Sequence, residues 1–214
     1  MAKLKKGIMG PLSGKIGPVV GASWKGVDYL RAAPETKGTG FAQSERQIAH
    51  QQKFKFITNF LDPFLPYVNI GFFKPNVQKT EYNMAFSYNF QEAVVGSHPD
   101  LLVDYNKFSI SRGSQAGLSN LQFEWVSLSE VRFTWLNESG YHARYDDQVM
   151  VVLYSPELQD TNGAIGAAYR RDGHVDFKLK EKFVGKALEV YVAVSTINRK
   201  KTSNSQYLGR KEFL

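Results

Sequence analysis

Hydrophobic and polar positions alternate with a period of two through most of the second half of the chain. Val131, Phe133 and Trp135 alternate with Arg132 and Thr134. This period is typical of half-buried β-strands. Strands are expected at residues 101–105, 107–111, 121–125, 130–135, 148–154, 166–170, 174–178 and 187–196, with a further edge strand in 203–214.

Turn-forming residues separate these strands at 111–114, 137–140, 160–163 and 171–173. About seven short strands at this spacing predict an immunoglobulin- or fibronectin-like β-sandwich, and we assign it to residues 101–214.

Residues 41–100 follow a helical pattern instead. A helix is expected from Gln43, where Ser44-x-x-Gln47 resembles a capping box, and Pro63 and Pro66 end it. Residues 66–76 are expected to form a loop or short strand. A second helix is expected at 80–95, stopped by Gly96. The predicted fold class is therefore mainly β with a helical N-terminal part.

Residues 1–40 are glycine-rich, and glycine lets a backbone bend or approach another backbone closely. The apolar residues between the glycines predict burial. The candidate assembly residues are Ile8, Leu12, Ile16, Val19, Val20, Trp24, Tyr29 and Leu30. Two structures fit this pattern: an extended arm that lies on a partner, or a set of short strands within one domain, and 27–31 resembles a short strand. We assign residues 1–40 as an extended glycine-rich basic arm.

A phosphate-binding loop does not fit the same segment. Gly14-Lys15 lacks a glycine at position 9, which is Met9, and lacks a hydroxyl after the lysine, where Ile16 stands. Pro18 also lies where the helix of a dinucleotide-binding fold would begin.

The basic residues concentrate at the two ends of the chain. The formal net charge is +7; residues 1–40 contain seven basic and two acidic side chains, and residues 198–214 contain five and one. The middle is therefore slightly acidic. Basic ends can bind nucleic acid, anionic lipid or acidic patches on sister subunits. The candidate phosphate contacts are Lys3, Lys5, Lys6, Lys15, Lys25, Arg199, Lys200 and Lys201.

No catalytic or cofactor motif stands out. Cys is absent, and none of the four His lies in an HExxH helix. Asp146-Asp147 is expected to be a solvated turn rather than a metal pair, because adjacent strand residues face opposite ways. We expect a protein that is not an enzyme and has no cofactor, although one sequence leaves open a pair of facing carboxylates.

Three segments resemble a family of uncharacterised Bacteroidota proteins that carries a domain-of-unknown-function label. They are SGKIGPVVGASWKGVDYLR near the start, the middle helix with its Gln and aromatic residues, and SNSQYLG near the end. The signature residues are Gly14, Lys15, Gly17, Trp24, Gly26, Arg31, Ser203, Ser205, Tyr207 and Gly209. The resemblance implies a fold that spans nearly the whole chain, and it implies no catalytic residue.

Three functions follow from these features. The first is a structural subunit, such as a virion, coat or filament protein, that self-assembles through its N-terminal arm and β edges. The second is a nucleic-acid-binding protein that uses the basic termini. The third is a carbohydrate- or protein-binding sandwich with exposed Tyr141, Tyr145 and Tyr169.

The location follows from two absences in the sequence. No apolar run approaches 18 residues, which excludes a helical membrane span. The basic N-terminus lacks the apolar region of a signal peptide, so we expect synthesis in the cytoplasm and a place in an assembled particle.

Overall fold

The computed structural model describes residues 2–4, 7, 10–34, 43–74 and 78–213. They belong to two compact units, Met1–Ser44 and Glu45–Leu214, which we call the N-terminal unit and the body. Each is described by itself.

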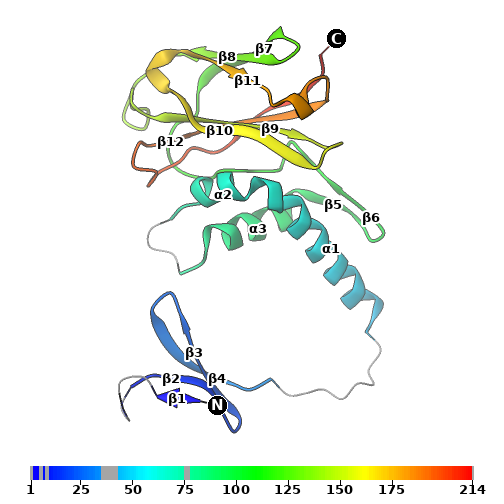
Figure 1. Cartoon of the computed structure of the whole chain (residues 1–214), viewed down its shortest axis with the longest axis vertical. Coiled ribbons are helices and arrows are strands. Elements are labelled where there is room, and N and C mark those ends of the chain that lie inside the picture. The colour runs from blue at the N-terminus through cyan, green and yellow to red at the C-terminus, as the bar shows by residue number, and fades with distance from the viewer. Residues whose placement is uncertain (1, 5–6, 8–9, 35–42, 75–77, 214) are drawn as a thin grey trace. The chain divides into compact units, whose positions relative to one another are not determined.

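The N-terminal unit is an antiparallel sheet of four strands in chain order (Figure 1). The strands are β1 (Lys3–Leu4), β2 (Leu12–Ile16), β3 (Val19–Trp24) and β4 (Val27–Ala32). A two-residue turn, Lys25-Gly26, joins β3 to β4, and both of its residues have positive φ angles of 47° and 82°. Such a turn matches the twist of the strands that it joins. The expectation of an extended arm is therefore wrong for the described residues, because this glycine-rich segment pairs with itself as a set of short strands.

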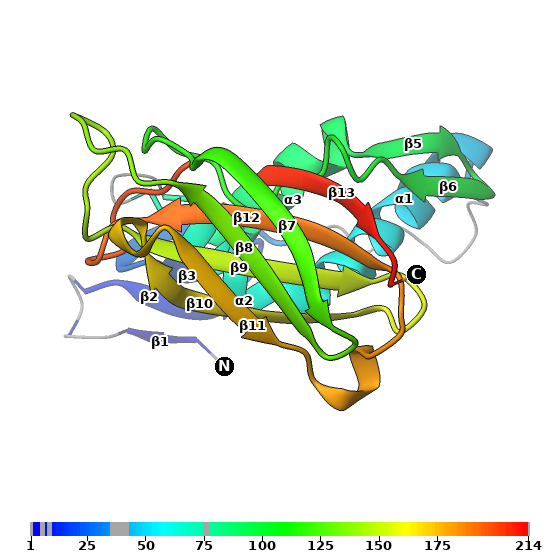
Figure 2. The same ribbon diagram turned by 90° about the horizontal axis from the view of Figure 1, so that it is seen from above.

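The body contains the expected β-sandwich. One sheet has the order β11-β8-β7 and the other has the order β10-β9-β12-β13 (Figure 2). The strands are β7 (Ser119–Ser127), β8 (Glu130–Leu136), β9 (Gln148–Ser155), β10 (Asp160–Tyr169), β11 (His174–Lys178), β12 (Leu188–Ser195) and β13 (Gln206–Lys211). Among the expected strands, β13 confirms the C-terminal edge strand.

The four-stranded sheet is buried on both faces. On β9, Val149, Val151 and Leu153 pack with the three-stranded sheet, while Met150 and Val152 pack with the helices. This explains the nearly continuous apolar run in β9 and β12, because a strand covered on both sides has no solvent-facing positions. The body thus has three layers, which Figure 1 shows in order.

The helical layer consists of α1 (Glu45–Leu61), a short 3₁₀ turn (Asp62–Phe64), α2 (Leu65–Gly71) and α3 (Glu81–Glu92). The hairpin β5 (Val94–Ser97) and β6 (Asp100–Val103) follows α3. Thr80 caps α3 by accepting a hydrogen bond from the Asn83 amide at 3.1 Å. Phe64, packed against Phe108 and Tyr154, joins this layer to the sheet.

Three local expectations are wrong. Residues 67–71 belong to helix α2, because Pro66 lies in its first turn, where a missing amide costs nothing. Residues 107–111 form no strand; Ser109 bonds the side chain of Asn89 instead. Residues 160–163 begin β10 rather than a turn, and buried Asn162 accepts a hydrogen bond from the Lys180 amide at 2.8 Å.

Candidate functional site

The N-terminal sheet has two chemically different faces. Its register pairs Gly14 with Gly21 and Gly21 with Leu30, so these three residues share one face. Since side chains alternate along a strand, the rest of each face follows. The aliphatic face contains Leu4, Leu12, Ile16, Val19 and Leu30; the basic aromatic face contains Lys3, Lys15, Trp24, Tyr29 and Arg31.

The aliphatic face is largely exposed. Among the described residues of the N-terminal unit only Gly21 is buried. A Cβ at Gly21 would lie 2.1 Å from the carbonyl oxygen of Leu12, so the backbone of Leu12 approaches too closely there for a side chain. Leu30 is 65% exposed, and Ile16 is 55% exposed. This sheet has no hydrophobic core of its own within the described residues.

The structure divides the candidate assembly residues between the two faces. Leu12, Ile16, Val19 and Leu30 lie on the aliphatic face. Val20, Trp24 and Tyr29 lie on the opposite face together with the bases Lys15 and Arg31. Ile8, Lys5 and Lys6 lie outside the described residues. Lys25 occupies the β3–β4 turn.

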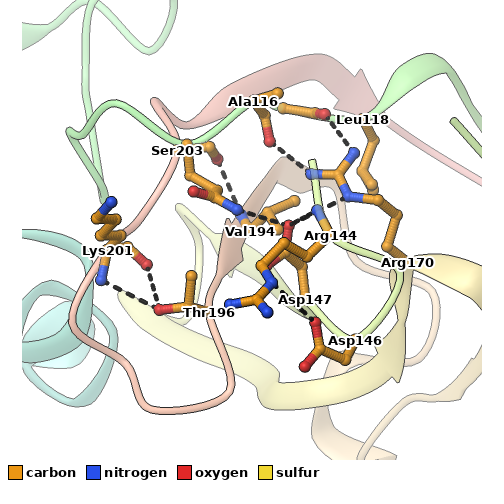
Figure 3. Close-up of polar contacts among 12 residues, drawn as sticks. Ala116, Leu118, Arg144, Asp146, Asp147, Arg170, Val194, Thr196, Lys201 and Ser203 are labelled. Atoms are coloured by element: carbon orange, nitrogen blue, oxygen red, sulfur yellow. Dashed lines mark hydrogen bonds and ion pairs between the residues drawn. The ribbon is translucent and has the colours of Figure 1, made fainter. Parts of the chain in front are cut away.

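The C-terminal basic cluster lies on the loop between β12 and β13. Arg199 has a φ of 56°, and its amide donates to the Thr196 carbonyl at 2.7 Å. The Thr196 amide donates to the Lys201 carbonyl at 2.9 Å, and the Lys201 amide donates to Thr196 Oγ1 at 3.2 Å (Figure 3). These bonds fix the loop that presents Lys200 and Lys201.

A cavity of about 750 Å³ is lined by this loop, the segment that follows α2, helix α3 and residues 112–114. Its basic lining residues come from three segments, and no acidic residue appears among its described lining residues. They are Lys74, Lys79, Arg112, Lys200 and Lys201. The guanidinium of Arg112 lies over the ring of Tyr88, 4.2 Å from its centroid. We call this cavity the first hollow.

A second hollow of about 540 Å³ is lined by the same loop. Lys200 and Lys201 line both hollows. Tyr141 and Arg144 line the second, where Arg144 Nε lies 3.8 Å from a carboxylate oxygen of Asp146. Tyr141 is 95% exposed.

The proposed tyrosine platform is only partly assembled. The Tyr145 carbonyl accepts a hydrogen bond from the Arg171 amide at 3.1 Å, and the Arg171 guanidinium lies 4.8 Å from the ring centroid of Tyr169. Tyr145 and Tyr169 are therefore neighbours, while Tyr141 belongs to the second hollow.

A buried ion pair supports the loops beside these hollows (Figure 3). Arg170 Nε lies 3.3 Å from Asp147 Oδ2, and both side chains are almost fully buried. The same oxygen accepts from Gln115 Nε2 at 2.8 Å and from the Arg144 amide at 2.9 Å. The expectation of a solvated Asp146-Asp147 turn is wrong for Asp147, because its carboxylate closes this network.

The SNSQYLG segment also has a structural role. Ser203 Oγ accepts from the Val194 amide at 2.9 Å, and the side chain of Gln206 bonds both the amide and the carbonyl of Leu118. Tyr207 donates to the buried carboxylate of Glu189, and burial together with this bond raises the pKa of Tyr207. The segment fixes β13 to the loop that contains Arg112.

Sequence reasoning found Lys200 and Lys201 but missed Lys74, Lys79 and Arg112. Lys74 and Lys79 lie between two helices, and Arg112 lies in an expected turn. A sequence shows only those charges that are close together along the chain. The basic cluster of the first hollow forms in space from three separate segments.

Neither a metal cluster nor a spanning helix occurs among the described residues. No group of three His, Cys, Asp or Glu side chains there is arranged to hold a metal ion. In the same part of the chain, no helix is long and apolar enough to cross a membrane.

Comparisons with known proteins place the chain in a broad context. A model described as "Family of unknown function (DUF6266)" matches residues 11–209. Among curated proteins, none matches the chain significantly. One similar solved structure is the fibronectin type III domain of the human collagen alpha-1(XX) chain, with 16% identity and a TM-score of 0.35; the match covers 46% of this chain and 88% of that one.

Proposed function

We propose that this chain, which belongs to the family of unknown function DUF6266, is a non-enzymatic structural subunit that self-assembles. The assembly is of the virion, coat or filament type and is a homo-oligomer. The observation that carries the proposal is the exposed aliphatic face of the N-terminal sheet. The Bacteroidota distribution and the two sequence motifs of the resemblance stay predictions.

A sheet with one apolar face needs a second layer. Stable domains consist of at least two packed layers, because burial of apolar surface is the main favourable contribution to folding. The N-terminal sheet supplies Leu12, Ile16 and Leu30 to one such layer, yet only Gly21 is buried among its described residues. The missing layer is expected to come from another chain.

The charges of the two faces favour a second copy as that layer. Asp28 is the only charged residue among the described strand residues of the aliphatic face. The opposite face has Lys3, Lys15 and Arg31, which would repel an identical surface. Two aliphatic faces related by a two-fold axis therefore bring together only one charged strand residue from each copy, Asp28, whereas two basic faces would bring together three.

The edge of β4 offers a way to extend the assembly. The Ala33 amide donates to the Pro18 carbonyl at 2.7 Å. In an antiparallel pair every second residue bonds the partner strand, so this bond shows which residues of β4 direct their amides and carbonyls toward β3. The amides and carbonyls of Asp28, Leu30 and Ala32 consequently point away from β3. An open strand edge of this kind can pair with a strand from a neighbour.

Two variants of the same strand test the proposal. Leu30→Glu places a charge on the aliphatic face, and Val27→Glu places the same charge on the opposite face of β4, where Val27 is 52% exposed. The wild-type chain is expected to elute as a multiple of 24.2 kDa by light scattering, at both low and high salt. Leu30→Glu should weaken a two-fold interface at least about a hundredfold, because each copy loses a buried leucine.

The matched control decides between the faces. Val27→Glu should assemble like the wild type. A wild-type monomer at every salt and protein concentration would overturn the proposal, and so would equal loss of assembly in both variants.

A further inference from the structure

We propose that the two hollows, which share Lys200 and Lys201, form a binding track for single-stranded nucleic acid. This activity goes beyond self-assembly and uses residues of the body alone. Its ligand class follows from the charge, the stacked side chains and the extent of the track.

The charge indicates a ligand with repeated negative groups. Five basic side chains from separate segments converge on the first hollow without an acidic residue among its described lining residues. Arg144 extends the series into the second hollow, beside Asp146. A polynucleotide carries one phosphate per nucleotide, and each contact with Lys or Arg releases bound counterions.

The stacked pair of Arg112 and Tyr88 indicates a ligand with flat aromatic groups. The guanidinium lies 4.2 Å from the ring centroid, and both residues line the hollow, where Arg112 is exposed to solvent. Bases stack on guanidinium and aromatic planes when they are not already stacked in a duplex. In the second hollow, the ring of Tyr141 is almost fully exposed.

The extent of the track favours a strand over a single nucleotide. Hollows of about 750 and 540 Å³ share Lys200 and Lys201, so one ligand can occupy both while its phosphates pass over the loop. The hydrogen bonds of Thr196 already fix this loop, which lowers the ordering cost of binding.

The test uses the full chain and a fluorescein-labelled 15-nucleotide thymidine oligonucleotide, followed by fluorescence anisotropy over a salt series. The double variant Lys200→Ala/Lys201→Ala should bind at least about tenfold more weakly, and the salt slope should fall by about 1.4 for two lost phosphate contacts. Lys178→Ala/Lys180→Ala is the matched control, since it removes two exposed bases near β11, outside both hollows. The control should bind like the wild type.

A second pair of measurements separates stacking from charge. Arg112→Lys keeps the charge and loses the planar group, so it should weaken oligonucleotide binding and leave the binding of heparin unchanged. A blunt DNA duplex should bind more weakly than the single strand. The proposal is overturned by no oligonucleotide binding at low salt, by equal loss in the two double variants, or by an Arg112→Lys variant that binds like the wild type.

Discussion

The central sheet of the body and the sheet of the N-terminal unit each have four antiparallel strands, but their faces are covered differently. In the body, helices cover one face and a second sheet covers the other, so Val151, Val190 and Val192 are fully buried. In the N-terminal unit, aliphatic side chains lie on one face and Gly21 alone is buried among the described residues. The body therefore has the layers of an independent domain, whereas the N-terminal sheet has one layer.

This difference assigns separate tasks to the two units. Burial in the body provides the stability of the fold, because its two hydrophobic clusters are complete within Glu45–Leu214. In the proposed assembly, the aliphatic face of the N-terminal sheet is buried when two chains associate. Folding and assembly should thus be separable by mutation.

Deletion of residues 1–44 is the strongest test of this separation. The remaining body should fold with an unchanged urea midpoint, because it retains both clusters, and it should be a monomer by light scattering. A deleted chain that still assembles would place the interface in the body. A deleted chain that does not fold would show that the N-terminal sheet belongs to the core of the body.

Disruption of the buried ion pair between Arg170 and Asp147 is expected to give the next largest effect. It should lower the stability of the body alone. Arg170→Met leaves the Asp147 carboxylate buried without its cation and removes the donors to the Ala116 and Gly117 carbonyls. The expected loss is about 3–5 kcal/mol of unfolding free energy, measured by urea denaturation. Trp135, which donates to the Arg170 carbonyl at 2.8 Å, is a fluorescent reporter nearby.

Two controls sharpen this measurement. Arg132→Met breaks an exposed pair with Asp176 and should change stability much less, because solvent screens that pair. The double variant Asp147→Leu/Arg170→Met should be more stable than Arg170→Met alone, since no charge is left buried. If Arg170→Met and Arg132→Met lower the free energy of unfolding by the same amount, the buried ion pair does not stabilise the fold more than the exposed pair does.

The sandwich could be predicted from the sequence because the alternation of apolar and polar residues that marks each strand lies within a few neighbouring residues. Alternation in 130–135 and 174–178, with turns between, identified β8 and β11. The start of β10 was missed because tertiary bonds of Thr161 and Asn162 outweigh the turn preference of Asp-Thr-Asn-Gly. Helix α2 was missed because prolines were interpreted only as helix ends.

The candidate sites were harder to predict, for a different reason. The apolar residues of the N-terminal unit were identified, but their division into two faces depends on a register that composition does not encode. Likewise, Arg112 and Lys200 line one hollow because hydrogen bonds of Ser203 and Gln206 join their two loops, and these bonds connect residues about 90 positions apart.

The smallest expected effect concerns pH and the β9–β10 hairpin of the body. The Lys182 ammonium bonds the Asp160 carboxylate and, with the Thr161 amide at 2.7 Å, holds the pKa of Asp160 below its usual range. A carboxyl group with a lowered pKa in the folded state stabilises the fold above its unfolded pKa of about 4. That contribution is lost as the pH falls from about 4 through the folded pKa.

Asp160→Asn should therefore be slightly less stable than the wild type at pH 6, and the stabilities of the two proteins should become equal near pH 2.5. Urea midpoints at both pH values measure this, and the difference at pH 6 should shrink in high salt, because both partners are more than a third exposed. A constant difference at both pH values would mean that the introduced amide disturbs packing rather than charge. The proposed assembly should be unaffected by the substitution, because its interface lies on the N-terminal sheet and Asp160 lies in the body.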